Sequence, residues 1–220
     1  DVERFSNLET GQQAVIDAPI MLELISKVAA SVKSDAKNML DIGSGAGNNT
    51  ISILRGINGI NCDLVDISLP MLEKAKERIS KEQGGEVRIF HGDFRDIALP
   101  NSHYDLIVAA AVLHHLRDDA DWENSFQKIY NLLKPEGAFF ISDMVHHQHS
   151  AIHNAMWDRY GKHLESVGGQ DYRDKVFEYI EIEDSPRSLS YQLELMKKVG
   201  FTSVDVLHKN SCFAAFVGIK

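Results

Sequence analysis

Hydrophobic residues occur along the chain in two alternating patterns. Short apolar runs predict strands at residues 38–42, 61–66, 86–90, 105–110 and 137–143. Stretches with helical spacing predict an early helix carrying an apolar stripe from Ile20 to Val32, followed by helices at 48–56, 69–82 and 120–133. Because strands alternate with helices, we expect an α/β fold whose mostly parallel sheet is covered on both faces.

The last part of the chain predicts a helix followed by a hairpin. Ser185 and Pro186 are typical of the cap and first turn of a helix, which we expect to end at Val199 before Gly200. Strands at 203–208 and 212–219 are separated only by Lys209-Asn210-Ser211, which forces an antiparallel pair. Together these elements predict a doubly wound, mostly parallel seven-stranded sheet with an antiparallel last strand.

Residues 145–184 do not fit this alternation. The segment is longer than a simple crossover needs and too rich in aromatic residues to be a disordered linker. We expect a helical cap insertion over the carboxyl ends of the strands, where ligands bind in open sheets. An N-terminal helical lid at residues 2–33 is expected to help close the pocket, chiefly through residues 2–15, and so to select the acceptor.

Composition sets limits on the kind of protein. A chain of 220 residues with 44% hydrophobic and 25% charged residues suits one domain, 1–220. A formal net charge of -9 argues against a nucleic-acid partner and against an anionic membrane. Cys62 and Cys212 lie in apolar runs, so we expect no disulfide and a cytoplasmic location. Asp17 and Glu23 interrupt the most apolar early stretch, which predicts no membrane span. The sequence leaves a homodimer open.

A glycine-rich loop follows the first predicted strand. Glycines at 43, 45 and 47 allow bare backbone to approach a ligand, and Asp66, about 20 residues further on, can hold a ribose. Dinucleotide-binding loops have glycine at the first, third and sixth positions, whereas the sixth position here is Asn48. We also expect Asp41 to present its carboxylate to the same cleft, which suits a cationic ligand. The sequence therefore predicts a nucleoside site and disfavours an NAD(P)-dependent oxidoreductase.

Further motifs follow in a regular order, and with them residues from about 37 to 145 resemble the class I S-adenosylmethionine (SAM) dependent methyltransferases. The matching segments are Met39-Leu40-Asp41-Ile42-Gly43-Ser44-Gly45-Ala46-Gly47, Asp63-Leu64-Val65-Asp66-Ile67-Ser68 with Met71, Gly92-Asp93-Phe94, Tyr104-Asp105-Leu106-Ile107-Val108 leading to Leu113-His114-His115-Leu116, and Leu133-Lys134-Pro135-Glu136-Gly137. The resemblance implies a Rossmann-like fold, SAM as cofactor, and transfer of its methyl group.

The resemblance also implies a set of cofactor-binding residues. Asp66 would accept both ribose hydroxyls, and Asp93 would accept the exocyclic amine of adenine while Phe94 covers the ring. Ile67 and Met71 would line the adenine, although both would also be ordinary core residues at these spacings. The full set is Asp41, Gly43, Gly45, Gly47, Asp66, Ile67, Met71, Gly92, Asp93, Phe94 and Ala109.

Candidate catalytic residues are histidines. In-line substitution at a sulfonium methyl needs a nucleophile within about 3 to 3.5 Å and a base only for acceptors that carry a proton. His114 is the candidate base or acceptor ligand, a structural histidine being the alternative. His146 and His147 follow the fifth strand, so we expect them to contact the acceptor. His149 and His153 could share a helix face and hold zinc or iron, but the cluster contains no acidic ligand and we expect no metal.

The layout of the whole chain also resembles a smaller group of methyltransferases, which includes the tRNA wobble-uridine enzymes that use carboxy-SAM. Those enzymes are expected to bind the extra carboxylate with an arginine one turn before a Gly-Phe pair, where this chain has Leu195. We therefore expect ordinary SAM and a small-molecule acceptor. If carboxy-SAM were preferred, Arg159, Arg173 or Arg187 would have to bind its carboxylate. A tRNA-modifying enzyme, an NAD(P)-dependent oxidoreductase and a non-catalytic SAM-binding module remain the alternatives.

Overall fold

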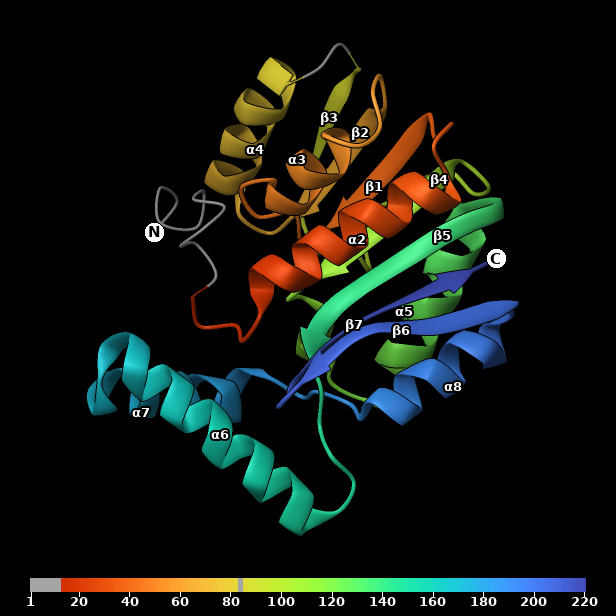
Figure 1. Ribbon diagram of the computed structural model, residues 1–220. Helices are drawn as coiled ribbons and strands as arrows, with labels where there is room; N and C mark the ends of the chain where they lie inside the picture. The colour runs from red at the N-terminus through yellow and green to blue at the C-terminus, as the bar shows by residue number, and fades with distance from the viewer. Residues whose placement is uncertain (1–12, 83–84) are drawn as a thin grey trace.

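A seven-stranded sheet forms the centre of the computed structural model, which describes residues 13–82 and 85–220 (Figure 1). The strand order is β3-β2-β1-β4-β5-β7-β6, with β1 to β5 parallel and β7 antiparallel to both of its neighbours. This confirms the predicted fold class. The strands are β1 (Asn38–Ile42), β2 (Asn61–Asp66), β3 (Val87–His91), β4 (Tyr104–Ala110), β5 (Leu133–Met144), β6 (Ser203–Asn210) and β7 (Phe213–Ile219).

Helices cover both faces of the sheet. One face is covered by α2 (Ala18–Val32), α3 (Asn48–Leu54) and α4 (Leu69–Glu82), and the other by α5 (Asp119–Leu132) and α8 (Leu189–Val199) (Figure 1). Successive strand residues point to opposite faces, so Met39 joins the core under α2 and α3 while Leu40 joins the core under α5 and α8. Both faces of each central strand are therefore buried, which explains the continuous apolar runs in the sequence.

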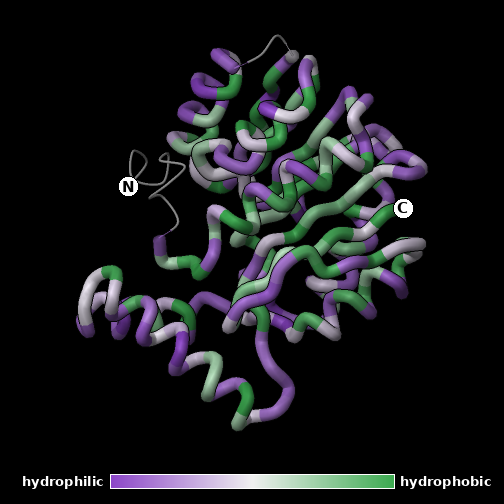
Figure 2. Tube along the Cα trace, viewed as in Figure 1, coloured by the Kyte–Doolittle hydropathy of each residue, from purple (hydrophilic) through white to green (hydrophobic). Residues whose placement is uncertain are grey.

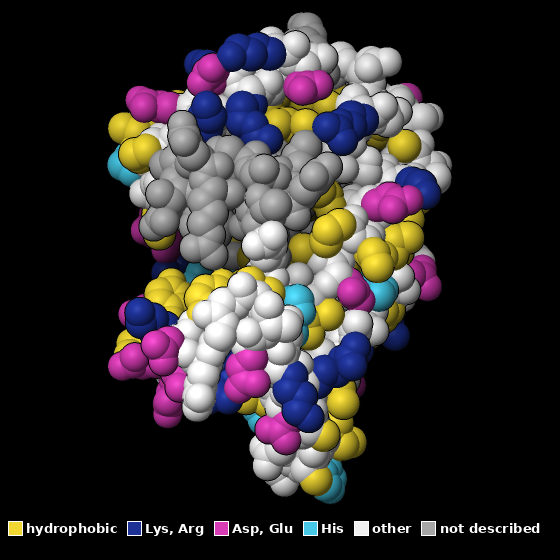
Figure 3. Space-filling model, turned by 60° about the vertical axis from the view of Figure 1, so that its left-hand side comes forward, with side chains coloured by type: hydrophobic (Ala, Val, Ile, Leu, Met, Phe, Trp, Pro, Cys, Tyr) yellow, Lys and Arg dark blue, Asp and Glu magenta, His cyan; other side chains and the backbone are white. Residues whose placement is uncertain are grey.

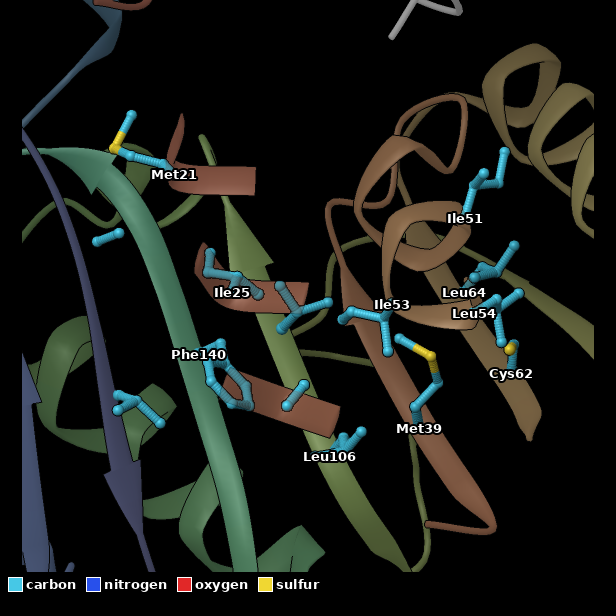
Figure 4. Packing of buried hydrophobic residues seen from close by; sticks show 14 of the residues in the cluster. Met21, Ile25, Met39, Ile51, Ile53, Leu54, Cys62, Leu64, Leu106 and Phe140 are labelled. Carbon is cyan, nitrogen blue, oxygen red and sulfur yellow. The ribbon is translucent and has the colours of Figure 1, made fainter. Parts of the chain in front are cut away.

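The first core fixes α2 and α3 against the sheet. Figure 4 shows Met21 and Ile25 of α2 on the side of Phe140 in β5, and Ile53 of α3 beside Met39. All five side chains are at most 1% exposed. Because α2 packs here as a core helix, the predicted lid at residues 2–33 is wrong for this part of the segment. Ala14 and Val15 do reach the ligand cleft described below, and residues 1–12 lie outside the described range.

Two turns differ from the prediction. β5 begins at Leu133 rather than 137, because Pro135-Glu136-Gly137 forms an irregularity within the strand, with Glu136 at φ 61°, instead of a turn before it. In the last hairpin, Asn210 still pairs with Phe213, so only Ser211 and Cys212 connect the strands. Ser211 has a left-handed φ of 51°, which allows this tight connection.

Residues 145–184, where the sequence predicts a helical cap, contain two helices; this segment is called the cap below. The cap consists of α6 (Ser150–Gly168) and α7 (Gln170–Glu183), and it projects beyond the sheet at the end where β5 finishes (Figure 1). Along both helices hydrophobic and hydrophilic stretches alternate (Figure 2). Its two ends meet at a neck, where His146 donates a backbone hydrogen bond to Arg187 at 3.1 Å and pairs with Ser188. The cap is thus an excursion between two adjacent points of the chain.

The surface carries both signs of charge. On the face shown in Figure 3, Lys and Arg side chains are interspersed with Asp and Glu. Within residues 13–82 and 85–220, no helix is both long and apolar enough to span a membrane.

The start of α8 differs from the prediction. Its N-cap is Ser188, whose hydroxyl accepts a hydrogen bond from the backbone N–H of Tyr191 at 3.2 Å, and not Ser185. Ser185 instead donates its backbone N–H to the carbonyl of His114 at 2.7 Å, which keeps this segment out of the helix. The predicted end is correct, because Gly200 caps the helix with a left-handed φ of 118°.

Replacement of Ser188 by alanine removes the side-chain cap of α8. We expect Ser188→Ala to lower the free energy of unfolding by about 0.5 to 2 kcal/mol, the usual effect of losing an N-cap hydroxyl. Ser185→Ala is the matched control and should change it by less. Urea unfolding of both variants measures the difference, and an equal or larger effect at Ser185 would contradict the assignment of the cap.

Candidate functional site

Two adjoining cavities lie at the carboxyl ends of the central strands. The nucleoside cavity, about 480 Å³, is lined among others by Val65, Gly92, Asp93, Phe94 and Leu116. The cap cavity, about 630 Å³, extends under the cap and is lined among others by Gly45, Met71, His114, Tyr160 and Asp184. Both cavities share Gly43, Asp66, Ala111, His115 and Tyr179. They therefore form one continuous cleft.

The glycine loop and Asp66 meet where the two cavities join. Asp66 accepts hydrogen bonds from the backbone N–H of Gly45 and of Ser68, each at 2.8 Å. Gly45 has a left-handed φ of 51°, and a Cβ atom placed on it would have no heavy atom within 4 Å. The backbone thus faces open space in the cap cavity, as a cradle for a ligand requires. The structure brings Gly43, Gly45 and Asp66 together as predicted.

Gly47 has a different place from the one predicted. It caps α3 with φ 83°, and a Cβ atom there would lie 2.9 Å from Cδ1 of Ile79 in α4. Gly47 lines neither cavity. This glycine lets α3 start close against α4, so its contribution to the cleft is indirect.

The nucleoside cavity contains four of the predicted residues. Ile67, Gly92, Asp93 and Phe94 all line it. Ile67 is 76% exposed, so its apolar side chain is accessible to a ligand in this cavity. The Asp93 carboxylate is held by Arg95, whose guanidinium is 2.7 Å away, and hydrogen bonding to Arg95 lowers the pKa of Asp93.

Of two more predicted residues, Met71 and Ala109, only Met71 reaches the cleft. Met71 lines the cap cavity, as expected for a ligand contact. Ala109 is fully buried within β4 and lines neither cavity. The strand continues through Ala110, and Ala111 has a left-handed φ of 53°, so the edge of the cleft comes at 110 and 111 instead.

Asp41 lies beneath the glycine loop and not in the cleft, so the predicted exposure of its carboxylate is wrong. The residue is fully buried, and one carboxylate oxygen accepts a hydrogen bond from Thr50 Oγ1 at 2.7 Å. The other oxygen, Oδ1, has no hydrogen-bond partner among the described residues. Burial raises the pKa of Asp41 to about 7, with a smaller contribution from the negative charge of Asp66.

His114 is held rigidly at the edge of the cap cavity. It belongs to the short 3-10 helix η1 (Leu113–His115), and its Nδ1 contacts Oδ1 of Asp143 at the end of β5. Because an ionised carboxylate only accepts hydrogen bonds, Nδ1 carries a proton, and in the neutral form of the ring Nε2 keeps its lone pair. Burial lowers the pKa of His114, but the charge of Asp143, its hydrogen bond and the charge of Asp184 together outweigh burial, so the net shift is upward.

Asp143 is buried and accepts several hydrogen bonds. Its Oδ2 accepts from the backbone N–H of Leu113 at 2.8 Å, and its Oδ1 accepts from the backbone N–H of Met144 at 2.7 Å. Burial raises the pKa of Asp143, but the charge of His114 and these hydrogen bonds bring it below its usual value.

The end of the cap supplies an acidic residue that sequence reasoning missed. Asp184 follows α7, and its side chain is only 3% exposed. Its Oδ1 lies 3.0 Å from Nδ1 of His115, and its Oδ2 lies 3.8 Å from Nε2 of His114. Asp184 is far from these histidines in sequence, and the backbone hydrogen bond from Ser185 to His114 holds the end of the cap beside them.

His146 and His147 lie at the neck and line neither cavity, so the structure does not bring them together with the other predicted site residues. The backbone N–H of Val145 still bonds to Cys212 beside β7 at 2.7 Å, so the chain continues past the cleft before these histidines. The ring of His146 lies 4.3 Å from that of His153, and His147 contacts Lys209 at 2.8 Å. His149 caps α6 through its own ring nitrogen.

Comparisons with known proteins show what this chain is similar to. Residues 39–137 match the model of the methyltransferase domain. Two relatives are named carboxy-S-adenosyl-L-methionine synthase: the protein of Nautilia profundicola is 24% identical over 90% of this chain and 84% of its own length. That of Shewanella halifaxensis is 27% identical over 91% and 83%.

Solved structures agree on the fold. Human N-acetylserotonin methyltransferase in complex with SAM superposes with a TM-score of 0.62 at 21% identity, over 99% of this chain and 56% of that one. An O-methyltransferase family protein from Burkholderia thailandensis gives a TM-score of 0.66 at 15% identity, over 96% and 62%. This chain thus spans less than two thirds of both structures. Residues 39–137 are similar to a methyltransferase domain, and the chain shares its fold with solved methyltransferases, one of which is in complex with SAM.

The raised pKa of Asp41 makes stability depend on pH. A carboxyl that ionises at 3.8 when unfolded and at about 7 when folded stabilises the protein below about pH 4, and this contribution is lost as pH rises to about 7. Asp41→Asn cannot ionise, so its free energy of unfolding relative to the wild type should rise by on the order of 2 kcal/mol between about pH 5 and about pH 8.

Urea unfolding at several pH values tests this expectation, with Asp96→Asn as the control at an exposed carboxylate. A difference between wild type and Asp41→Asn that does not change with pH would contradict it.

Proposed function

We propose that this methyltransferase transfers the methyl group of SAM to a small-molecule acceptor bound under the cap. The observation that carries the proposal is the continuity of the nucleoside cavity with the cap cavity across Gly43 and Asp66. One half has the residues for the donor's nucleoside and the other has room for a second molecule. Two reactants held side by side in one cleft are what an in-line transfer requires.

The donor half fits SAM. The Asp66 carboxylate can accept the ribose hydroxyls, because each of its oxygens has a further lone pair beyond the bond from Gly45 or Ser68. Asp93 and Phe94 line the part of the cleft where adenine would lie. The bare backbone at Gly45 leaves room for the rest of the molecule. When bound, SAM supplies an electrophilic methyl group on a sulfonium sulfur.

The acceptor half suits a small molecule. A cavity of about 630 Å³ is in the range that encloses a drug-sized ligand. Its walls include apolar and aromatic side chains from the cap and from β7, which exclude water from the transfer: Tyr160, Tyr172, Val176, Tyr179, Ile180 and Phe213. His114 presents the lone pair of Nε2 at the same wall, where an acceptor can donate a hydrogen bond or a proton.

Synthesis of carboxy-SAM is the second candidate function, favoured by the names of the relatives in Nautilia profundicola and Shewanella halifaxensis. The charges that line the cap cavity argue against carboxy-SAM synthesis. Three carboxylates line that cavity, from Asp66, Asp143 and Asp184, while its lining residues in the described part of the chain include no lysine or arginine. A further carboxylate on the donor would be desolvated there without a cation.

The three arginines considered from the sequence contact other residues. Arg159 lies near Asn210, Arg173 pairs with Asp174, and Arg187 pairs with Asp119. Leu195 is buried in the core between α8 and the sheet, so its position is not part of the cleft. The preference for ordinary SAM therefore rests on the lining of the cap cavity.

Asp66→Asn tests the donor site. We expect the variant to bind SAM about 10- to 150-fold more weakly, because a hydrogen bond to a charged group contributes roughly 1.5 to 3 kcal/mol. Calorimetric titration measures the affinity, with Asp96→Asn as the control outside both cavities. Equal affinity in Asp66→Asn and wild type, or tighter binding of NAD than of SAM, would overturn the assignment.

Product analysis tests the reaction. We expect the protein, given SAM and a mixture of metabolites, to form S-adenosylhomocysteine together with a methylated compound. Carboxy-SAM is expected to displace SAM only at higher concentration than SAM itself. Formation of carboxy-SAM, or its tighter binding, would favour the second function; SAM binding with no turnover would indicate a non-catalytic module.

A further inference from the structure

Three ligand atoms converge at the wall of the cap cavity. One atom each from His114, His115 and Asp184 lie within 4.8 Å of one another. The two histidines are neighbours on η1, with ring centres 4.2 Å apart, and Asp184 reaches them from the end of the cap. All three residues line the cap cavity. Two imidazoles and a carboxylate grouped in this way are the elements of a metal site with open coordination positions.

His114 is already oriented as a metal ligand. Asp143 accepts the proton of its Nδ1, which directs the lone pair of Nε2 toward Asp184. Histidines that bind metals almost always donate their other ring nitrogen to a carboxylate or carbonyl in this manner. The 3.8 Å between Nε2 and Oδ2 of Asp184 is too long for a hydrogen bond, and it leaves the two atoms able to share an ion.

Asp184 provides an independent observation. Its side chain is only 3% exposed, and its Oδ1 has no hydrogen-bond partner among the described residues. Its ion-pair contacts in that part of the chain are to His114 and His115, with no lysine or arginine. These histidines carry a positive charge only when protonated, and a bound divalent ion would supply a permanent positive charge beside this buried carboxylate.

We propose that His114, His115 and Asp184 bind a divalent transition-metal ion at the acceptor end of the cleft. Imidazole and carboxylate together suit zinc or ferrous iron, whereas magnesium and calcium prefer oxygen ligands alone. The ion would take the Nε2 lone pair of His114 and leave positions open toward the cavity for an oxygen or nitrogen of the acceptor. The role of the acceptor here rests on the proposed function, with the ion in place of the direct contact between Nε2 of His114 and the acceptor, whereas binding of the ion itself does not depend on it.

Metal titration tests the site without any acceptor. Untagged protein is freed of metal with a chelator and titrated with Zn²⁺ by calorimetry, with elemental analysis of the dialysed product. We expect one ion per chain. Asp184→Asn and His115→Ala should each weaken Zn²⁺ binding by more than about 10-fold. Loss of a residue that only hydrogen-bonds to a metal ligand weakens metal binding by about 10-fold or more, so loss of a ligand itself should have at least this effect.

The controls separate this site from the other histidines. His153→Ala removes a ring from the neck cluster and should leave Zn²⁺ affinity unchanged. Thermal unfolding checks that each variant is folded, and His115→Ala, whose side chain is 44% exposed, is the variant that least disturbs the core. Failure of the wild type to bind Zn²⁺ in stoichiometric amount would overturn the proposal. So would binding that His153→Ala abolishes while Asp184→Asn and His115→Ala retain it.

Discussion

The buried carboxylate of Asp143 is the constraint on which the cap cavity depends. At the end of β5 it accepts backbone hydrogen bonds from Leu113 and Met144 and holds the ring of His114. A buried charge requires such partners, so the turn after β4 is fixed against the end of β5. The carbonyl of His114 then receives the backbone N–H of Ser185, which fixes the end of the cap. One carboxylate thus orders two segments that are distant in sequence.

The sheet could be predicted because its strands are buried on both faces and its helices carry one apolar stripe each. Local turn chemistry was less reliable. Pro135-Glu136-Gly137 resembles a turn but lies within β5, which pairs with β4 on both sides of it and with β7 from Ala138 onward. Ser185 resembles an N-cap, yet its backbone bonds to His114 and Ser188 takes that role. In both places long-range hydrogen bonds decided between local alternatives that the sequence could not rank.

The candidate site likewise contains residues that the sequence could place and residues that it could not. Gly45, Asp66 and Phe94 follow strand ends directly, so the order of strands predicts that they meet. His146 and His147 also follow a strand end, but the chain there continues beside β7 and passes the cleft. Asp184 lies at the end of an insertion whose path no periodicity describes. Its only signal was its position directly before the Ser-Pro pair at the return of the chain to the sheet.

The neck has a consequence for how this protein could change over evolutionary time. The backbone bond from His146 to Arg187 brings the two ends of the cap side by side. A segment that leaves and re-enters a fold at one place can be lengthened, shortened or exchanged without altering the path of the sheet. The donor half of the cleft would remain intact through such changes while the walls of the acceptor half were rebuilt. The cap could therefore be exchanged as a unit, and chimeras joined at the neck are a natural route to new acceptors.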